Sequence, residues 1–436
     1  MQRKPLAWLT PGLVLILAAC SSGGSSGAAS TAASQPAASA ASSEPSTSAA
    51  AGSAQLLVWA DNSANTAKAI KPLCEKWAAD NGVTCTVQNF NGPGELKDAV
   101  LKANKSGNVP DIFEGPHDQI GLFVQDGALA PIDLGDNASK FAKAALAGVS
   151  ANGNTYGVPW ALENIALLTN KSLAPNCPAT LDEAVTNAKS LIADGKATKG
   201  LGIAMQIGEK GDAYHWYPMF SSDGGYAFAQ NSDGTYNPDD MGVGNDGSIA
   251  AGKRLATLVD GGILKGSVSY DIARETFGKG KSPYFITGPW QIPEQSKALG
   301  DNLVVCPIPP WQGGKAATPF IGVRTFMQTA KAKNSALAAT FLQDAVMTTD
   351  FMDGMFAVDP RPPAWLESFD KAAADPVIKG FGEYGQSGIP TPSIAQMGAV
   401  WNDLGLAEYK IANGADAGDT MTKAEDSINK TNANIQ

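Results

Sequence analysis

Aromatic and acidic side chains are the residues of this chain whose types suit a binding site. An aromatic ring offers a large flat apolar face on which a flat apolar face of a ligand can stack. A carboxylate accepts hydrogen bonds from two adjacent hydroxyls. The chain has nine tryptophans, among them Trp160, Trp216, Trp290, Trp311, Trp365 and Trp401. Trp290 is the first candidate, because Gly288-Pro289 separates it from the apolar run Tyr284–Ile286 and should place it at a strand's carboxyl end.

The motifs of several other functions do not occur in the sequence. Gly92-Pro93-Gly94 lacks the Lys-Ser/Thr that completes a phosphate-binding loop, and there is no Gly-x-Ser-x-Gly elbow. His117 and His215, the two histidines, stand in no catalytic or zinc-binding pattern. Asn231-Ser232-Asp233-Gly234 lacks the full spacing and terminal Glu of a calcium loop, so a hairpin turn is the better interpretation. We therefore expect no cofactor and no metal.

The N-terminus has the pattern of an export signal. Arg3 and Lys4 precede an apolar run over 6–19, and Leu17-Ala18-Ala19-Cys20 closes it with small residues and a cysteine. The run is shorter than the roughly 20 residues that a membrane-spanning helix needs. A cysteine at this point resembles the lipobox of bacterial lipoproteins, so residues 1–20 are predicted to be a signal peptide ending in lipidated Cys20.

A Ser- and Ala-rich tract, residues 21–54, separates this signal from the globular part. Glu44 is its only charged residue, so the tract can bury little and is predicted to be a disordered linker. The globular part begins near Gln55 and is long enough for two domains. The whole chain has a net charge of −10 and a pI of about 4.8, which argue against a nucleic-acid partner.

Four cysteines remain in the globular part, Cys74, Cys85, Cys177 and Cys306. An even number in an exported chain favours disulfides over a metal site. Cys74–Cys85 is the favoured local pair and would leave Cys177–Cys306, although spacing alone does not fix the connectivity.

Strand and helix patterns alternate along the chain. Residues 56–59 form a short apolar run typical of a buried strand, 83–87 alternate as a second strand, and Pro110-Asp111-Ile112-Phe113 begins a third. Apolar residues recur every three or four positions over 67–77, which predicts a helix. Thr180 and Glu183 have the spacing of a capping box, and Asn334 is a predicted N-cap for the helix after it. The pattern indicates an α/β fold with helices on both faces of its sheets.

Several short segments in this order resemble the extracytoplasmic carbohydrate-binding proteins of ABC importers, with maltose/maltodextrin-binding proteins as the nearest branch. The resemblance runs from Leu56 to about Ala415. The segments that carry it are Val58-Trp59, Pro110–Phe113 with His117-Asp118, Tyr156-Gly157-Val158-Pro159, Glu163, Asn170-Lys171, Asp223-Gly224-Gly225-Tyr226-Ala227-Phe228, Phe277-Gly278-Lys279-Gly280, Gly288-Pro289-Trp290, Pro319–Val323, and Gln396-Met397 before Trp401.

The resemblance implies a two-lobed periplasmic-binding-protein-like fold with a hinge and an interlobe cleft. The N-terminal lobe would comprise residues 55–162 and 324–368, and the C-terminal lobe residues 164–320 and 375–436. Crossovers would lie near Glu163, Gly322 and Ala372. A sugar would bind in the cleft, as is usual for ligands at domain interfaces.

The resemblance also implies the site residues. Trp290, Trp401 and Tyr214 match aromatic residues that stack on sugars. The polar candidates are Asp118, Glu163, Asp61, Gln119 (where the family has an Arg) and Glu209. His117 matches a supporting histidine beside the binding Asp. Relative to the family, the segment over 209–214 carries two extra residues, so Glu209 and Tyr214 are matched to family positions with a shifted alignment.

The chain departs from the family pattern at several of these positions. Gly115-Pro116 replaces an aromatic residue of the family, and Asn402 replaces a Tyr. Gly405 stands where the family has an Arg, and the first-strand loop lacks the family's Asp-Lys pair. The resemblance implies a malto-oligosaccharide ligand, and these departures leave another oligosaccharide open.

The expected function is therefore that of a lipid-anchored, monomeric binding protein outside the cytoplasmic membrane, which delivers its sugar to an ABC permease. A Gram-positive surface is favoured, and a periplasm is the alternative. Two other functions remain open. A glycoside hydrolase would use two cleft carboxylates about 5–9.5 Å apart, and a glycan-binding adhesin or chemosensory component would share the fold but not the partner.

Overall fold

The computed structural model describes residues 54–61, 65–232, 235–385 and 388–435. All of them belong to one compact unit, Gly52–Gln436. The predicted lipidated Cys20 and the predicted linker lie outside the described residues, except Ala54. Within the described part, no helix has both the length and the apolar character needed to cross a membrane.

The first sheet gathers strands that are far apart in sequence. Its order is β14-β13-β3-β1-β2, and β6 pairs with β13 on a separate branch. β1 is parallel to β2 and β3, whereas β13 is antiparallel to β3 and β6. The bounds are β1 Gln55–Asp61, β2 Thr84–Phe90, β3 Ile112–Pro116, β6 Val158–Asn164, β13 Phe320–Gln328 and β14 Ile389–Pro390.

Helices and short turns pack around this sheet. In β1 the buried side chains of Leu56, Val58 and Ala60 alternate with less buried neighbours, as the apolar pattern predicts for a strand. The bounds are α1 Thr66–Asp80, α2 Pro93–Ser106, η1 His117–Gln119, α3 Ile120–Gln125, η2 Gly135–Lys140, α4 Lys143–Gly148, β4 Ser150–Ala151, β5 Asn154–Thr155, α10 Ser335–Phe341, η5 Leu342–Val346, α11 Thr349–Val358 and α12 Leu366–Ala372.

The second sheet has the order β12-β7-β11-β8. β7 is antiparallel to both of its neighbours, and β11 is parallel to β8. The bounds are β7 Ala166–Asn170, β8 Ile203–Ala204, β11 Tyr284–Thr287 and β12 Leu303–Cys306. The other elements of this part are α5 Leu181–Ala193, α6 Ala213–Ser222, β9 Tyr226–Gln230, β10 Tyr236–Gly242, α7 Asp246–Asp260, α8 Tyr270–Gly278, η3 Pro289–Gln291, α9 Ile292–Leu299, η4 Gly300–Asn302, α13 Pro376–Gly385, α14 Met397–Ala412 and α15 Ala417–Asn432.

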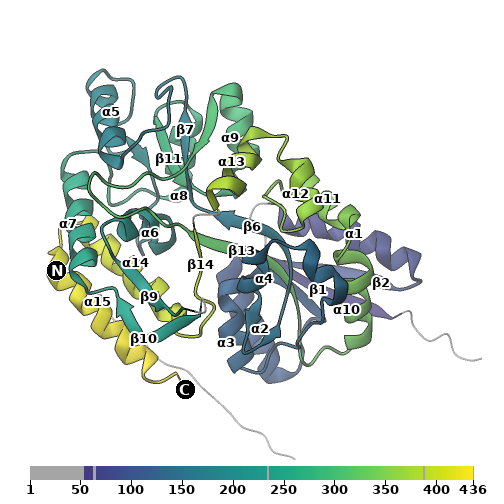
Figure 1. Ribbon diagram of the computed structural model, residues 1–436. Coiled ribbons are helices and arrows are strands. Elements are labelled where there is room, and N and C mark those ends of the chain that lie inside the picture. The colour runs from purple at the N-terminus through teal and green to yellow at the C-terminus, as the bar shows by residue number, and fades with distance from the viewer. Residues whose placement is uncertain (1–53, 62–64, 233–234, 386–387, 436) are drawn as a thin grey trace, which may run out of the picture. The chain divides into compact units, whose positions relative to one another are not determined.

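The hydrophobic core is divided between two lobes. Buried residues over 56–161 and 323–365 form one cluster, and those over 165–320 and 372–428 form two others. β6 and β13 run between the elements around β1 and those around β7 and β11 (Figure 1). They pair with each other in a register that sets Glu163 opposite Gly322. The predicted crossovers near these two residues therefore lie side by side, while the predicted lobe boundaries stay a prediction.

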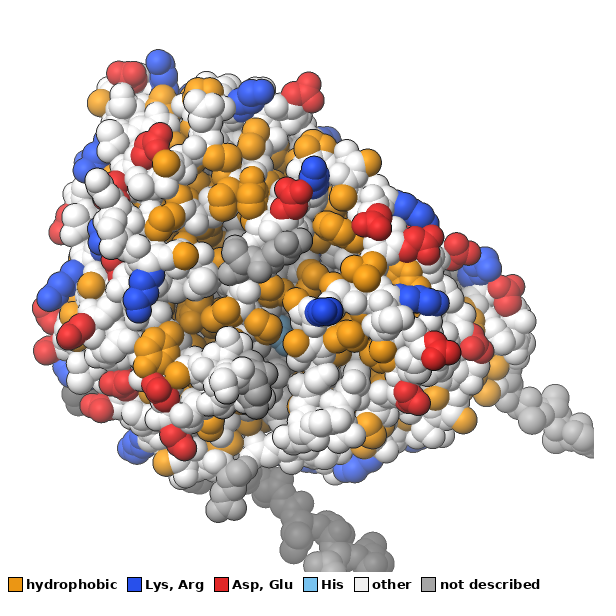
Figure 2. Space-filling model, in the orientation of Figure 1, with side chains coloured by type: hydrophobic (Ala, Val, Ile, Leu, Met, Phe, Trp, Pro, Cys, Tyr) orange, Lys and Arg blue, Asp and Glu red, His pale blue; other side chains and the backbone are white. Residues whose placement is uncertain are grey.

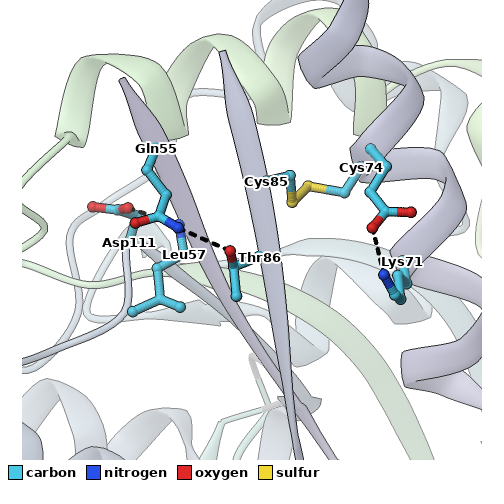
Figure 3. The surroundings of a disulfide bond; sticks show 8 residues. Gln55, Leu57, Lys71, Cys74, Cys85, Thr86 and Asp111 are labelled. Atoms are coloured by element: carbon cyan, nitrogen blue, oxygen red, sulfur yellow. Dashed lines mark hydrogen bonds and ion pairs between the residues drawn. A yellow bond between two sulfur atoms is a disulfide. The ribbon is translucent and has the colours of Figure 1, made fainter. Parts of the chain in front are cut away.

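Both predicted disulfides are present. Cys74 on α1 bonds to Cys85 on β2, with a Cα–Cα distance of 6.0 Å, and so ties the edge strand to its covering helix (Figure 3). Cys177 bonds to Cys306 at the end of β12, with a Cα–Cα distance of 5.6 Å.

Most of the local predictions are confirmed. β9 and β10 pair antiparallel, as the hairpin prediction requires, although residues 233–234 of its turn lie outside the described part. Thr180 accepts a hydrogen bond from the N–H of Glu183 at 3.1 Å, as the capping box predicts. Glu183 Oε2 accepts a hydrogen bond from the N–H of Ala179, one residue before the Thr180 N–H that a capping box predicts.

Asn334 is the N-cap residue of α10, as predicted, but not through the usual side-chain bond. Its side chain makes no capping hydrogen bond. The side-chain amide of Asn334 donates to the carbonyl of Gln55 at 2.9 Å. The backbone N–H of Asn334 donates to Asp111 Oδ1 at 2.9 Å. A tertiary contact to the start of β1 therefore replaces the local cap.

Candidate functional site

A cavity of about 850 Å³ lies between the two lobes. Its lining comes from elements of both hydrophobic cores, and the hollow that opens between the lobes in Figure 2 has apolar side chains on both sides. The residues that line the cavity are Asn91, Pro93, Gly94, Lys97, Pro116, His117, Asp118, Gln119, Glu163, Gln206, Tyr214, His215, Tyr270, Trp290, Gly322, Arg324, Arg361, Thr391 and Trp401.

Three half-buried aromatic rings form the second-lobe wall. Tyr214 comes from the first turn of α6, Trp290 from η3 and Trp401 from the first turns of α14. The ring centroid of Tyr214 is 6.3 Å from that of Trp290 and 5.9 Å from that of Trp401. The structure thus brings together the three aromatic residues predicted for the site.

Trp290 occupies its place because β11 ends just before it. The strand stops at Thr287, and a Cβ on Gly288 would lie 2.2 Å from the Trp290 ring. The indole N–H donates a hydrogen bond to the hydroxyl of Tyr270, which also bonds to Thr287 at 3.1 Å. The ring is therefore held in position at the end of the strand, with part of its surface left to the cavity.

Asp118 joins the two lobes across the cavity. Its Oδ2 accepts a hydrogen bond from the Trp401 indole N–H at 3.1 Å. Burial raises the pKa of Asp118, while this hydrogen bond and the positive charges of Arg324 and Lys97 act in the opposite direction. Gln119 follows Asp118 in η1 and lines the same cavity.

Glu163 lies at the crossover between the lobes and is paired with a cation. Arg361 Nη1 contacts Glu163 Oε1, and Arg361 Nε bonds to Asp359 Oδ1 at 3.0 Å. The Arg361 guanidinium also lies over the Trp160 ring, 5.6 Å from its centroid. Glu163 is therefore oriented by a buried guanidinium while its side chain borders the cavity.

Asp61 belongs to the buried network behind the cavity. It is fully buried and forms an ion pair with Arg324 Nη2 at 2.9 Å. Arg324 also bonds to Glu114 through Nε at 2.9 Å and through Nη2 at 2.6 Å, and the Trp160 indole N–H donates to Glu114 at 2.9 Å. Burial raises the pKa of Glu114 to about 7. The structure thus brings Arg324, but not the predicted Asp61, to the cavity.

His117 has the supporting position predicted for it. Its Nδ1 accepts a hydrogen bond from the Val323 N–H at 3.0 Å, so its Nε2 carries the proton and donates to the Thr391 carbonyl at 3.1 Å. Burial lowers its pKa from 6.5 to about 4, which keeps the ring neutral. The imidazole therefore ties η1 to β13 and to the segment after β14.

Glu209 is exposed in the loop between β8 and α6 and does not line the cavity. The backbone of this loop packs against α14. A Cβ on Gly211, at a φ of +74°, would lie 1.6 Å from the carbonyl oxygen of Gly405. The loop before α6 therefore meets α14 at Gly405, where both backbone segments approach closely because neither glycine has a side chain.

Several lining residues have no counterpart in the sequence predictions. They are Asn91, Lys97, Gln206, His215, Tyr270, Arg324 and Arg361. Arg361 meets Glu163 across 198 residues of sequence, so no local pattern could reveal that pair. His215 had a local signal, because Asp212 stands three residues before it at the start of α6.

Among the described residues, no group of three or more His, Cys, Asp or Glu side chains could hold a metal ion. The arrangement is therefore one of aromatic faces on one side of a cleft and oriented carboxylates on the other. Such a site can enclose a polar ligand that has flat C–H faces.

Comparison with known proteins assigns the chain to a family. The model of the bacterial extracellular solute-binding proteins matches residues 72–380. A galactooligosaccharide-binding protein of Bacillus subtilis (strain 168) is 27% identical over 374 residues, which cover 83% of this chain and 85% of that protein. A maltooligosaccharide ABC transporter solute-binding lipoprotein of Streptococcus pneumoniae (strain ATCC BAA-255 / R6) is 27% identical over 388 residues, covering 86% and 87%. A maltotriose-binding protein of Pyrococcus abyssi (strain GE5 / Orsay) is 28% identical over 361 residues, covering 81% and 76%. Since the family model covers more than half of the chain, this protein belongs to the bacterial extracellular solute-binding proteins.

Proposed function

We propose that this protein captures malto-oligosaccharides in its interlobe cleft and delivers them to the permease of an ABC importer. The observation that carries the proposal is the wall of Tyr214, Trp290 and Trp401 facing oriented carboxylates across one cavity. Relatives named for maltooligosaccharide and maltotriose binding support the choice of sugar.

In this proposal the three aromatic rings stack on the C–H faces of successive sugar units. Asp118 and Glu163 accept hydrogen bonds from sugar hydroxyls, and Gln119 adds an amide beside Asp118. Lys97 and Arg361 line the same cavity and can donate to hydroxyl oxygens. Asp61 and Glu209 take no direct part, because neither lines the cavity.

Binding is proposed to couple to closure of the lobes. Asp118 comes from η1 in one lobe and Trp401 from α14 in the other, so their hydrogen bond forms only when the lobes approach. The paired strands β6 and β13 cross between the lobes and provide the hinge. A ligand that contacts both lobes would bind the closed form more tightly and shift the equilibrium toward it.

The protein is proposed to be held outside the cytoplasmic membrane as a monomer, by a lipid on Cys20 and a linker over 21–54. The lipobox-like end of the signal and the relative named as a lipoprotein support the anchor. Labelling cells with a radioactive fatty acid tests it: Cys20→Ser should remove the label and release the protein into the medium.

Calorimetric titration tests the sugar-binding proposal. The panel comprises maltose, maltotriose, maltotetraose, isomaltose, raffinose, xylobiose and galactobiose. Saturable binding of the α-1,4 series with a Kd of about 1 μM, near −8 kcal/mol, is expected. Binding of galactobiose alone would favour the second candidate, a galactooligosaccharide, which the relative from Bacillus subtilis suggests. Absence of binding to every sugar would refute the proposal.

We further propose that the cleft binds without hydrolysing. Glu163 is held in an ion pair with Arg361, and the relatives of this chain are named for binding sugars, whereas a glycosidase needs two carboxyls across the scissile bond, one of them protonated. The same titration checks this point, since hydrolysis would give continuing heat and shortened products by chromatography.

A further inference from the structure

His215 is buried in the second-lobe wall, and Asp212 fixes the orientation of its imidazole. Asp212 caps α6, where its Oδ1 accepts the backbone N–H of His215 at 3.1 Å and its Oδ2 contacts His215 Nδ1 at 2.7 Å. An ionised carboxylate only accepts hydrogen bonds, so Nδ1 carries the proton. In the neutral imidazole the other ring nitrogen, Nε2, is then an acceptor.

Asp212 is itself held by a second helix. Its backbone N–H donates to Glu408 Oε2 on α14, and Glu408 is fully buried. Burial raises the pKa of Glu408 well above its ordinary value. The adjacent Gly211 packs against Gly405 on the same helix. The Asp212–His215 pair is therefore fixed relative to α14, which also carries Trp401.

The acceptor atom of His215 has no partner in the described part of the chain. Nε2 is shielded from solvent and makes no hydrogen bond, although the ring lines the cavity. Its ring lies 5.7 Å from Trp290 and 5.9 Å from Tyr270, centroid to centroid, and these two also line the cavity. A buried acceptor without a donor costs free energy, so a partner is expected from what the cavity holds.

We propose that His215 is a ligand-binding residue whose Nε2 accepts a hydrogen bond from one hydroxyl of the bound sugar. The inference rests on the proposed function and adds to it a specificity-determining residue, because a sugar without that hydroxyl would leave the acceptor unpaired. Asp212 is the positioning residue that presents Nε2, and Trp290 stacks on the neighbouring face of the same sugar unit.

The test compares His215→Asn and His215→Phe with the wild type, using maltotriose and its monodeoxy analogues in calorimetric titrations. Asn keeps a donor for Asp212 but has no atom at Nε2, and Phe keeps the ring shape without nitrogens. Both variants should bind maltotriose at least 10-fold more weakly than the wild type. For the wild type, the Kd of one monodeoxy analogue should be at least 10-fold higher than the Kd of maltotriose. For either variant, the Kd of the same analogue should be less than 2-fold higher than that of maltotriose.

Gln295→Met is the matched control. Gln295 is fully buried, its Oε1 also lacks a partner among the described residues, and it does not line the cavity. Its maltotriose Kd should therefore match the wild type. A structural role for His215 predicts instead that the ligand-free variants unfold at lower urea while the Kd is unchanged, which would overturn the inference. The inference would also be overturned if no monodeoxy analogue showed a loss of affinity for the wild type that the His215 variants abolish. Failure of the wild type to bind any sugar of the panel would refute the proposed function first, and this inference with it.

Discussion

Glu114 and His117 are buried behind the cleft, and their titrations should change stability in opposite directions. Burial raises the pKa of Glu114 from 4.5 to about 7, against the opposing charge of Arg324. Burial lowers the pKa of His117 from 6.5 to about 4. Each shift is about 2.5 pKa units, which corresponds to roughly 3 kcal/mol of differential stability.

The sign differs because the folded protein holds one proton more tightly and the other less tightly than the unfolded chain. The Glu114 contribution is fully present below pH 4.5 and is lost as the pH rises through 7. The His117 contribution is present above pH 6.5 and is lost as the pH falls through 4. Between these limits the slopes of these two groups offset each other.

Single substitutions should reveal the two titrations in urea unfolding at pH 5 and pH 8. The destabilisation caused by Glu114→Gln should be about 2 kcal/mol larger at pH 5 than at pH 8, and that caused by His117→Asn about 2 kcal/mol larger at pH 8. Glu275→Gln is the control, because the ion pair with Lys279 lowers the pKa of this exposed carboxyl, which therefore stays ionised from pH 5 to pH 8. Equal destabilisation at both pH values in either buried variant would refute the reasoning.

Three further variants test packing and binding. Trp290→Ala removes a stacking face, so the maltotriose Kd should rise at least 10-fold, about 1.4 kcal/mol, in a calorimetric titration; an unchanged Kd would remove Trp290 from the site. Replacing Cys177 and Cys306 together by Ser opens a covalent link across 129 residues, and the free energy of unfolding in urea should fall by about 4 kcal/mol, so a loss below about 1 kcal/mol would contradict the loop-entropy argument. Gly211→Ala places a Cβ 1.6 Å from the Gly405 carbonyl oxygen, so the loop must move and the midpoint of urea unfolding should drop; a midpoint equal to the wild type would show that this contact is dispensable.

Local patterns predicted the elements that carry the site. The apolar period over 67–77 became α1, and the run before Gly288 became β11, which ends where Trp290 enters the cavity. These predictions succeed because helix and strand periods are properties of a few consecutive residues. The resemblance then supplied Trp401, Asp118 and Tyr214, which the structure brings to one cavity.

Long-range pairing limited the rest. Asp61 faces Arg324 in a buried ion pair, and Glu163 meets Arg361, with partners far along the chain in both cases. Asn334 is the N-cap of α10 but its side chain bonds to the start of β1, again a tertiary contact. Glu209 does not line the cavity, and its loop instead meets α14 through the close approach of Gly211 to Gly405, which no local pattern predicts.

The most direct test of the account is a crystal structure of this protein with maltotriose. We predict the sugar in the interlobe cavity, with one glucose face on the Trp290 ring and hydroxyls within hydrogen-bond distance of Asp118 and Glu163. A maltotriose bound outside the cavity, or inside it without contact to Trp290, Trp401 or Tyr214, would contradict the central claim that these aromatic rings form the sugar site.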